Sequence, residues 1–136
     1  MNKLMVNKED AVLVLIDFQE RLMPAMHNKE ELEKTVEKLI KGCKILGVPA
    51  IVTQQYTKGL GPTIPSLHEA LGDYNPIEKT SFSAMGEPEF EKELKELGRK
   101  SVILTGIESH VCVQQTALDL IDKGYDVFLV VDCVSS

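Results

Sequence analysis

Cys112 is a candidate nucleophile because the sequence around it predicts the start of a helix. The segment Ser101–Ile121 begins with a short apolar run, breaks at Gly106 and resumes with apolar residues at helical spacing. This pattern predicts a strand, a turn and a helix. Ser109 is the expected N-cap, so Cys112 would lie at the third helical position, where backbone N–H groups and the helix dipole favour a thiolate. The alternative is a buried cysteine that packs as a small hydrophobic residue.

Two further reactive groups lie in or after predicted strands. Asp17 directly follows the apolar run Ala11–Ile16, which is typical of a strand buried on both faces of a parallel sheet. Ligands of open α/β sheets bind beyond the carboxyl ends of the strands, so Asp17 is a candidate catalytic group as well as a candidate helix cap or surface residue. Lys79 lies in the extended segment Ile77–Ser83, where a single lysine is usually exposed to solvent.

Strands and helices that would position these groups alternate along the chain. Besides the elements named above, the pattern predicts a helix between Asn28 and Gly47, a strand after Pro49, a helix after Pro88 and a strand at Tyr125–Val131. This order favours one domain, residues 1–136, with a three-layer α/β/α architecture and a doubly wound, mainly parallel, Rossmann-like sheet. Because the sequence stops just after an apolar strand with no covering helix, we expect a C-terminally truncated domain.

Composition restricts the possible function classes. The 136 residues carry a net charge of −6, which disfavours a nucleic-acid partner. No hydrophobic run has the length of a membrane span or the form of a secretory signal, so no membrane partner is expected. Three cysteines without CxxC spacing argue against a disulfide framework and fit a reducing compartment. We therefore expect a cytoplasmic protein.

From about Ala11 to its last residue, the sequence resembles the isochorismatase-like cysteine hydrolases. Members of this family have a strand ending in D-x-Q, a central lysine and a G-[IV]-x-[ST]-x-x-C-V segment. Here these motifs read Asp17-Phe18-Gln19, Lys79 within EKTSFSA, and Gly106–Val113. The third motif is fairly specific, and the first two are weak when taken alone. The sequence is most similar to a small, poorly characterised branch of the family, whose members usually continue with a further helix, strand and helix.

The resemblance implies a catalytic triad of Asp17, Lys79 and Cys112. Asp17 would act as general base and then general acid, Lys79 would lower the pKa of the thiol, and Cys112 would attack an acyl carbon to form a thioester. The resemblance also implies a cis peptide bond between Ile107 and Glu108. This bond would turn the Glu108 N–H toward the Cys112 N–H as an oxyanion hole.

The expected substrate pocket combines aromatic and polar residues near these motifs. Its candidate residues are Phe18, Gln19, Tyr56, Phe82 and His110. Ordinary core or rim packing is the alternative for the aromatic side chains. The resemblance implies a small-molecule substrate and a homo-oligomer.

The sequence departs from some relatives in its metal ligands. Relatives that hydrolyse nicotinamide carry an Asp-x-His pair and a further histidine after the second strand, whereas this chain reads Thr53-Gln54-Gln55-Tyr56 there. We therefore expect no metal and no cofactor. A thiol nucleophile favours a small amide or related carbonyl substrate over the vinyl ether of isochorismate. Two alternatives stay open, namely an inactive family member and a non-catalytic α/β binding module such as a receiver-like domain.

Overall fold

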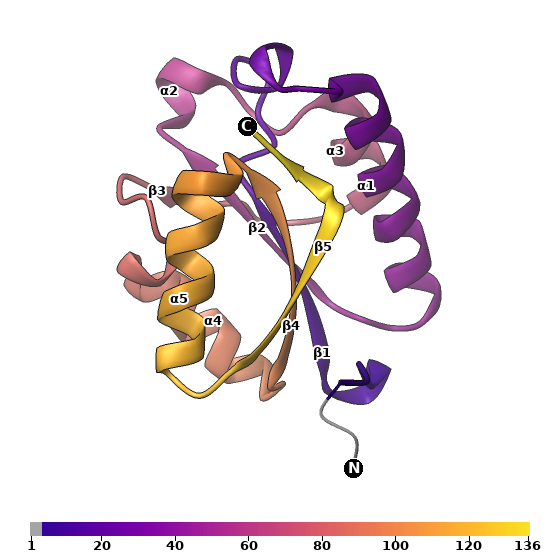
Figure 1. Cartoon of the computed structure of the whole chain (residues 1–136), viewed down its shortest axis with the longest axis vertical. Coiled ribbons are helices and arrows are strands. Elements are labelled where there is room, and N and C mark those ends of the chain that lie inside the picture. The colour runs from indigo at the N-terminus through magenta and orange to yellow at the C-terminus, as the bar shows by residue number, and fades with distance from the viewer. Residues whose placement is uncertain (1–3) are drawn as a thin grey trace.

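Five parallel strands form the central sheet of the computed structural model, which describes residues 4–136 (Figure 1). The strands are β1 (Ala11–Ile16), β2 (Ala50–Gln55), β3 (Ile77–Lys79), β4 (Ser101–Ile107) and β5 (Asp126–Ser135). Their order across the sheet is β3-β2-β1-β4-β5, and each neighbouring pair is parallel. The direction of winding therefore reverses between β1 and β4, which confirms the predicted doubly wound sheet.

Helices cover both faces of this sheet (Figure 1). They are α1 (Lys29–Ile45), α2 (Thr57–Leu60), α3 (Pro65–Leu71), α4 (Pro88–Leu97) and α5 (Gln114–Asp122). The apolar sides of α1 and α3 pack in one core cluster, and those of α4 and α5 pack in another on the opposite face. The short helix α2 lies at the end of the molecule where the strands finish. The three-layer α/β/α prediction is confirmed.

Strand β1 lies at the centre of both core clusters. All six of its residues are buried, and they alternate between the two faces of the sheet. Leu13 and Leu15 pack toward α1, whereas Val12, Val14 and Ile16 pack toward α4 and α5. Burial on both faces explains why the sequence of β1 is a continuous apolar run without polar alternation.

Gly106 allows β4 to approach β1 closely where the winding reverses. Its φ is +145°, which side chains rarely adopt, and a Cβ added there would lie 2.4 Å from Ile16 Cβ and 2.6 Å from the Ile16 carbonyl oxygen. Both the conformation and the space require glycine at this position. The close pairing of β1 and β4 brings together the segments that follow the two strands.

Strand β5 forms one edge of the sheet, and its burial differs from the sequence prediction. The apolar run Tyr125–Val131 predicts a buried strand, yet Leu129 is exposed and Val131 is 78% exposed. Only Cys133 of this strand is fully enclosed. An edge strand has a neighbour on one side only, and Leu118 and Ile121 of α5 are also exposed. The predicted burial of this strand is therefore wrong.

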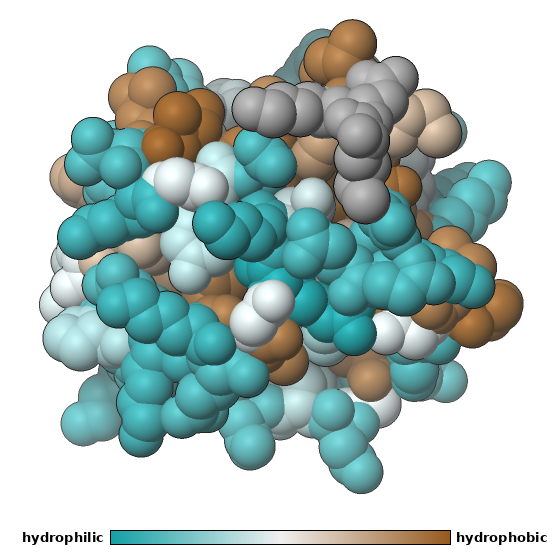
Figure 2. Space-filling model, turned by 90° about the horizontal axis from the view of Figure 1, so that it is seen from below, coloured by the Kyte–Doolittle hydropathy of each residue, from teal (hydrophilic) through white to brown (hydrophobic). Residues whose placement is uncertain are grey.

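The two ends of the molecule differ in chemical character. Figure 2 views the end at which the strands begin, and hydrophilic side chains cover most of that face. Within residues 4–136, no helix combines the length and apolar character needed to cross a membrane. The groups with candidate chemistry lie at the opposite end, where the strands finish.

Candidate active site

Asp17 follows β1 directly and is completely buried, with both carboxylate oxygens bonded. Its φ of +55° turns the chain sharply out of the strand. Oδ1 accepts a hydrogen bond from Thr53 Oγ1 at 2.8 Å, and Oδ2 lies 2.8 Å from Lys79 Nζ. The fixed carboxylate therefore presents a negative charge at the carboxyl end of the central strand.

Lys79 is the last residue of β3, and its side chain is 0% exposed. In β3, Ile77 and Lys79 face inward and Glu78 faces solvent, so strand alternation turns the lysine toward β2 and β1. Nζ donates to Asp17 Oδ2 at 2.8 Å and to Gln55 Oε1 at 2.7 Å. Lone lysines in extended segments are usually exposed, and here the ion pair with Asp17 offsets part of the cost of burying the charge.

Cys112 lies in a π-helical turn, Ser109–Val113, which precedes α5. Its side chain is only 8% exposed and packs in the same apolar cluster as Ile16 and Ala84. The charges of Asp17 and Lys79 both act on the thiol and shift its pKa in opposite directions. The structure therefore brings the three candidate catalytic groups together at the carboxyl ends of β1, β3 and β4.

The protonation preference of Cys112 is opposite to the one expected from its position at the start of a helix. Burial raises the pKa of its thiol, and this effect outweighs the Lys79 ammonium, which lowers that pKa. The Asp17 carboxylate raises the pKa further. Burial therefore opposes the thiolate that the helix start was expected to favour, and Cys112 lies beside a carboxylate that can accept the thiol proton.

The predicted N-cap at Ser109 is also wrong. Ser109 is the first residue of the π-helical turn, and Glu108 takes the cap position without a side-chain hydrogen bond. The Ser109 hydroxyl instead bonds the Ser136 hydroxyl at 2.6 Å, and Ser136 Oγ lies 2.8 Å from His110 Nδ1. The turn is therefore held by Ser136, the residue that follows β5. The peptide bond between Ile107 and Glu108 is cis.

Thr116 of α5 connects the cysteine turn to the segment that follows Lys79. Its buried hydroxyl donates to the Cys112 carbonyl oxygen at 2.7 Å and accepts from the Ala84 N–H at 2.9 Å. One side chain thus fixes the distance between two segments that are about thirty residues apart.

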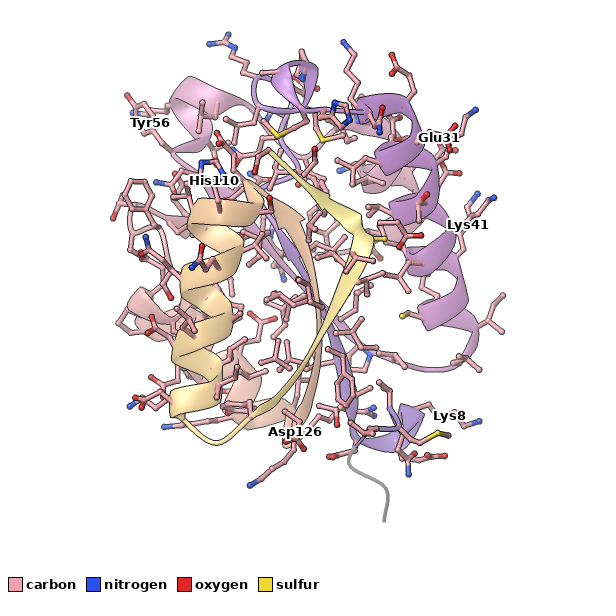
Figure 3. All side chains as sticks on the ribbon, in the orientation of Figure 1. Lys8, Glu31, Lys41, Tyr56, His110 and Asp126 are labelled. Carbon is pink, nitrogen blue, oxygen red and sulfur yellow. The ribbon has the colours of Figure 1, made fainter. Side chains whose placement is uncertain are left out.

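The five candidate pocket residues fall into two groups. Phe18 is buried in the core cluster on the α1 side, and Gln19 is buried with its amide bonded to backbone groups of Gln55 and Gly61. Tyr56, Phe82 and His110 are exposed. Figure 3 places Tyr56 and His110 at the end of the molecule where the strands finish, which is the end that contains Asp17 and Cys112.

Thr53 and Gln55 are functional candidates that the sequence analysis did not single out. Both belong to β2, and Thr53 is the register partner of Ile16 in β1. They bond Asp17 and Lys79, respectively. The sequence does show that both residues lie at the end of a predicted strand. Only the strand order shows that this strand lies next to the strand that ends at Asp17.

Two surface clefts lie apart from Asp17, Lys79 and Cys112. The clefts have volumes of about 580 and 680 Å³ and are lined mainly by residues of α1, α3 and the loop before α1, without Asp17, Lys79 or Cys112. In the described part of the chain, no group of three His, Cys, Asp or Glu side chains could hold a metal ion.

Comparison with known proteins places the chain in a family. The model of the isochorismatase domain matches residues 11–136. The chain belongs to the isochorismatase family. Its α/β/α fold is therefore one that it shares with solved structures of this family.

Three relatives illustrate the similarity. Isochorismatase domain-containing protein 1 of Danio rerio is 43% identical over 127 residues, which cover 93% of this chain and 44% of that protein. The structure of MAR1 ribonuclease from Caenorhabditis elegans is 45% identical with a TM-score of 0.88, covering 96% of this chain and 67% of that one. The Escherichia coli YcaC product, described as an octameric hydrolase of unknown specificity, is 30% identical with a TM-score of 0.91. The match covers 96% of this chain and 66% of the YcaC chain. The chain thus spans about half the length of the first of these relatives.

Proposed function

We propose that residues 1–136 act as a cysteine-dependent hydrolase domain that cleaves a small amide or related carbonyl compound at Cys112. The observation that carries this proposal is the buried Lys79–Asp17 ion pair, which has a 2.8 Å separation and acts directly on the Cys112 thiol. Burying an ion pair costs free energy that a hydrophobic pair of similar size would not. Perturbed, buried charges around a nucleophile are typical of active sites.

In the first half of the reaction, Cys112 Sγ attacks the substrate carbonyl carbon while Asp17 takes the thiol proton. The backbone N–H groups of Glu108 and Cys112 would stabilise the negative oxygen of the tetrahedral intermediate. Asp17 then returns the proton to the leaving nitrogen as the C–N bond breaks, which leaves a thioester and a free amine.

In the second half, water attacks the thioester and Asp17 accepts a proton from it. The C–S bond breaks, the carboxylic acid leaves and Cys112 regains a proton. Lys79 keeps Asp17 in place and offsets part of the rise in the pKa of the thiol that burial causes. Every step uses side chains of the chain, its backbone and water, without a cofactor or metal.

The size of the site supports a small substrate. Asp17 and Lys79 are inaccessible to solvent and Cys112 is nearly so, and a small compound reaches such buried groups more easily than a bulky one. We place Tyr56, Phe82 and His110 at the mouth of the pocket, with Phe18 and Gln19 supporting it from behind.

We also infer a homo-oligomeric, cytoplasmic protein. The octameric state of the YcaC relative and the exposed Leu129 and Val131 on the β5 edge support self-association. Three cysteines that are all free fit a reducing compartment. Light scattering of the purified chain tests the assembly, and a monomer at micromolar concentration would contradict it.

RNA cleavage is a second candidate function, favoured by the 45% identity to a protein described as a ribonuclease. The net charge of −6 disfavours it, because affinity for RNA depends on neutralising phosphates with basic side chains. Cleavage of a single-stranded RNA that Cys112→Ala abolishes would favour this function over amide hydrolysis.

The deciding experiment follows ammonia or amine release from a panel of small aliphatic and aromatic amides. The unmodified chain should hydrolyse at least one of them, and Cys112→Ala should lower kcat by about 10⁴-fold or more. Asp17→Asn should lower kcat as well, whereas Cys43→Ala should not. A Cys112→Ala variant that retains turnover contradicts the proposal, and a folded chain without turnover on any amide would favour an inactive family member.

A further inference from the structure

The carboxamide of Gln55 has a fixed orientation. Its Oε1 lies 2.7 Å from Lys79 Nζ. An ammonium group has donors only, so the oxygen and not the amide nitrogen must face it. The two N–H bonds of Gln55 Nε2 therefore point away from Lys79.

The backbone of Gln55 is held in place by Gln19. Gln55 N–H donates to Gln19 Oε1 at 2.7 Å, and Gln19 Nε2 donates to the Gln55 carbonyl oxygen at 2.8 Å. Gln19 Nε2 also donates to the Gly61 carbonyl oxygen at 2.8 Å, and Gln19 is completely buried. The position of Gln55 is thus fixed from the backbone side and from the side-chain oxygen.

Gln55 Nε2 is accessible and has no partner in residues 4–136. Within these residues, no group forms a hydrogen bond with Gln55 Nε2. Every buried side-chain nitrogen or oxygen atom in the same residues does have a hydrogen-bond partner. An unpartnered Nε2 in this half-buried residue must therefore reach solvent. Because Gln55 and Cys112 both interact with Lys79, these N–H donors lie beside the proposed reaction centre.

We propose that Gln55 binds substrate, its Nε2 donating a hydrogen bond to an oxygen next to the scissile carbonyl. This inference rests on the proposed hydrolase function and narrows its substrate class. The site would select compounds that carry a carbonyl, carboxylate or ether oxygen at that position over compounds with an N–H donor or an alkyl group there. Gln19 acts as a positioning residue for this donor.

Alkylation of Cys112 tests the proposal without knowledge of the substrate. Iodoacetamide carries a carbonyl oxygen next to the attacked carbon, and allyl bromide carries none. The ratio of their rate constants at Cys112, measured by peptide mass spectrometry, cancels changes in thiol ionisation because both reagents need the same thiolate. The ratio should be higher at Cys112 of the unmodified chain than for glutathione.

Two variants then isolate the donor. Gln55→Glu keeps an acceptor for Lys79 but loses the N–H donors, and Gln55→Met removes both. Each should lower the ratio about three- to tenfold, which corresponds to one lost hydrogen bond. Gln115→Glu, on the exposed side of α5, is the matched control and should leave the ratio unchanged. Fast labelling of Cys43 and Cys133 in the same sample identifies an unfolded variant.

The outcomes separate this inference from the proposed function. If neither reagent labels Cys112 ahead of Cys43 and Cys133, the hydrolase proposal itself fails. If Cys112 is labelled first but its ratio equals that of glutathione, or if a folded Gln55 variant keeps the original ratio, only the role of Gln55 is overturned. The comparison of Cys112 with glutathione needs no variant, so it tests the role of Gln55 even if both substitutions prevent folding.

Discussion

The centre of the sheet and its β5 edge each bury a cysteine, and the two sulfur atoms have different neighbours. Cys133 of β5 is fully enclosed, and burial together with Asp132 raises the pKa of its thiol to about 12. Burial also raises the pKa of the Cys112 thiol, but there the Lys79 ammonium opposes the effect and Asp17 can take the proton. Burial alone favours an unreactive thiol, and under our proposal the buried ion pair beside Cys112 supplies the chemistry that Cys133 lacks.

Removing the Lys79–Asp17 ion pair should have the largest effect, because, of the two cysteine sites, only that of Cys112 contains such a pair. Lys79→Met leaves the Asp17 carboxylate buried without its partner, so the free energy of unfolding should fall by about 3–5 kcal/mol. Urea denaturation measures the change. Lys41→Met is the matched control, because Lys41 forms an ion pair of the same 2.8 Å length with Glu37 but is 61% exposed. The control should unfold like the unmodified chain, and an equally stable Lys79→Met variant would show that the buried charge needs no partner.

The pH dependence of labelling should sharpen the comparison between the two sulfur atoms. The pKa of Cys112 lies above the usual thiol value of 9.0, so its labelling by iodoacetamide should keep rising about tenfold per pH unit to pH 9 without levelling off. At pH 8, iodoacetamide should label Cys133 at least about 100-fold more slowly than Cys112, because Cys133 is enclosed and the pKa of its thiol is about 12. A plateau for Cys112 near pH 7 would mean that Lys79 outweighs burial.

Glu87 offers a smaller test, on the segment that follows Lys79. Its Oε2 accepts hydrogen bonds from Ser81 Oγ at 2.6 Å and from the Thr80 and Ser81 N–H groups at 3.3 Å, and these bonds lower the pKa of the Glu87 carboxyl. A lowered pKa in the folded state stabilises the fold above pH 4.5, and this stabilisation is lost as the pH falls through the folded value.

Glu87→Gln should therefore lower the free energy of unfolding by about 1–2 kcal/mol at pH 7, and this difference should be smaller at about pH 3. Glu89→Gln, on the exposed side of α4 just after Glu87, should cost less than about 0.5 kcal/mol. Thermal unfolding at both pH values measures this, and a pH-independent difference would rule out the carboxylate as the cause.

The sequence predicted much of the fold because the signals there are local. Strand β1 is a continuous apolar run, and Asp17 follows it directly, so both its burial and the place of the acid were predictable. For β5 the same kind of run misled, because an edge strand and a central strand have similar sequences when one face of the edge stays apolar. Strand order, which decides between them, depends on contacts far apart in the chain.

The site was less predictable than the fold, for the same reason. From local sequence, Lys79 was more plausibly exposed, and only the family motif indicated its role. Gln55 became a candidate once the structure placed it between Gln19 and Lys79. The pKa of Cys112 was predicted in the wrong direction, since the helix terminus is visible in the sequence and the burial of the thiol is not.

Acyl transfer from p-nitrophenyl acetate tests the central claim most directly. The reaction is stopped in acid, which preserves thioesters, and the acetyl group is located by peptide mass spectrometry. We expect a single acetyl group on Cys112 and none on Cys43 or Cys133. Acetyl groups on surface lysines with Cys112 unmodified would contradict the account, because the sulfur beside the Lys79–Asp17 pair would then not be a nucleophile.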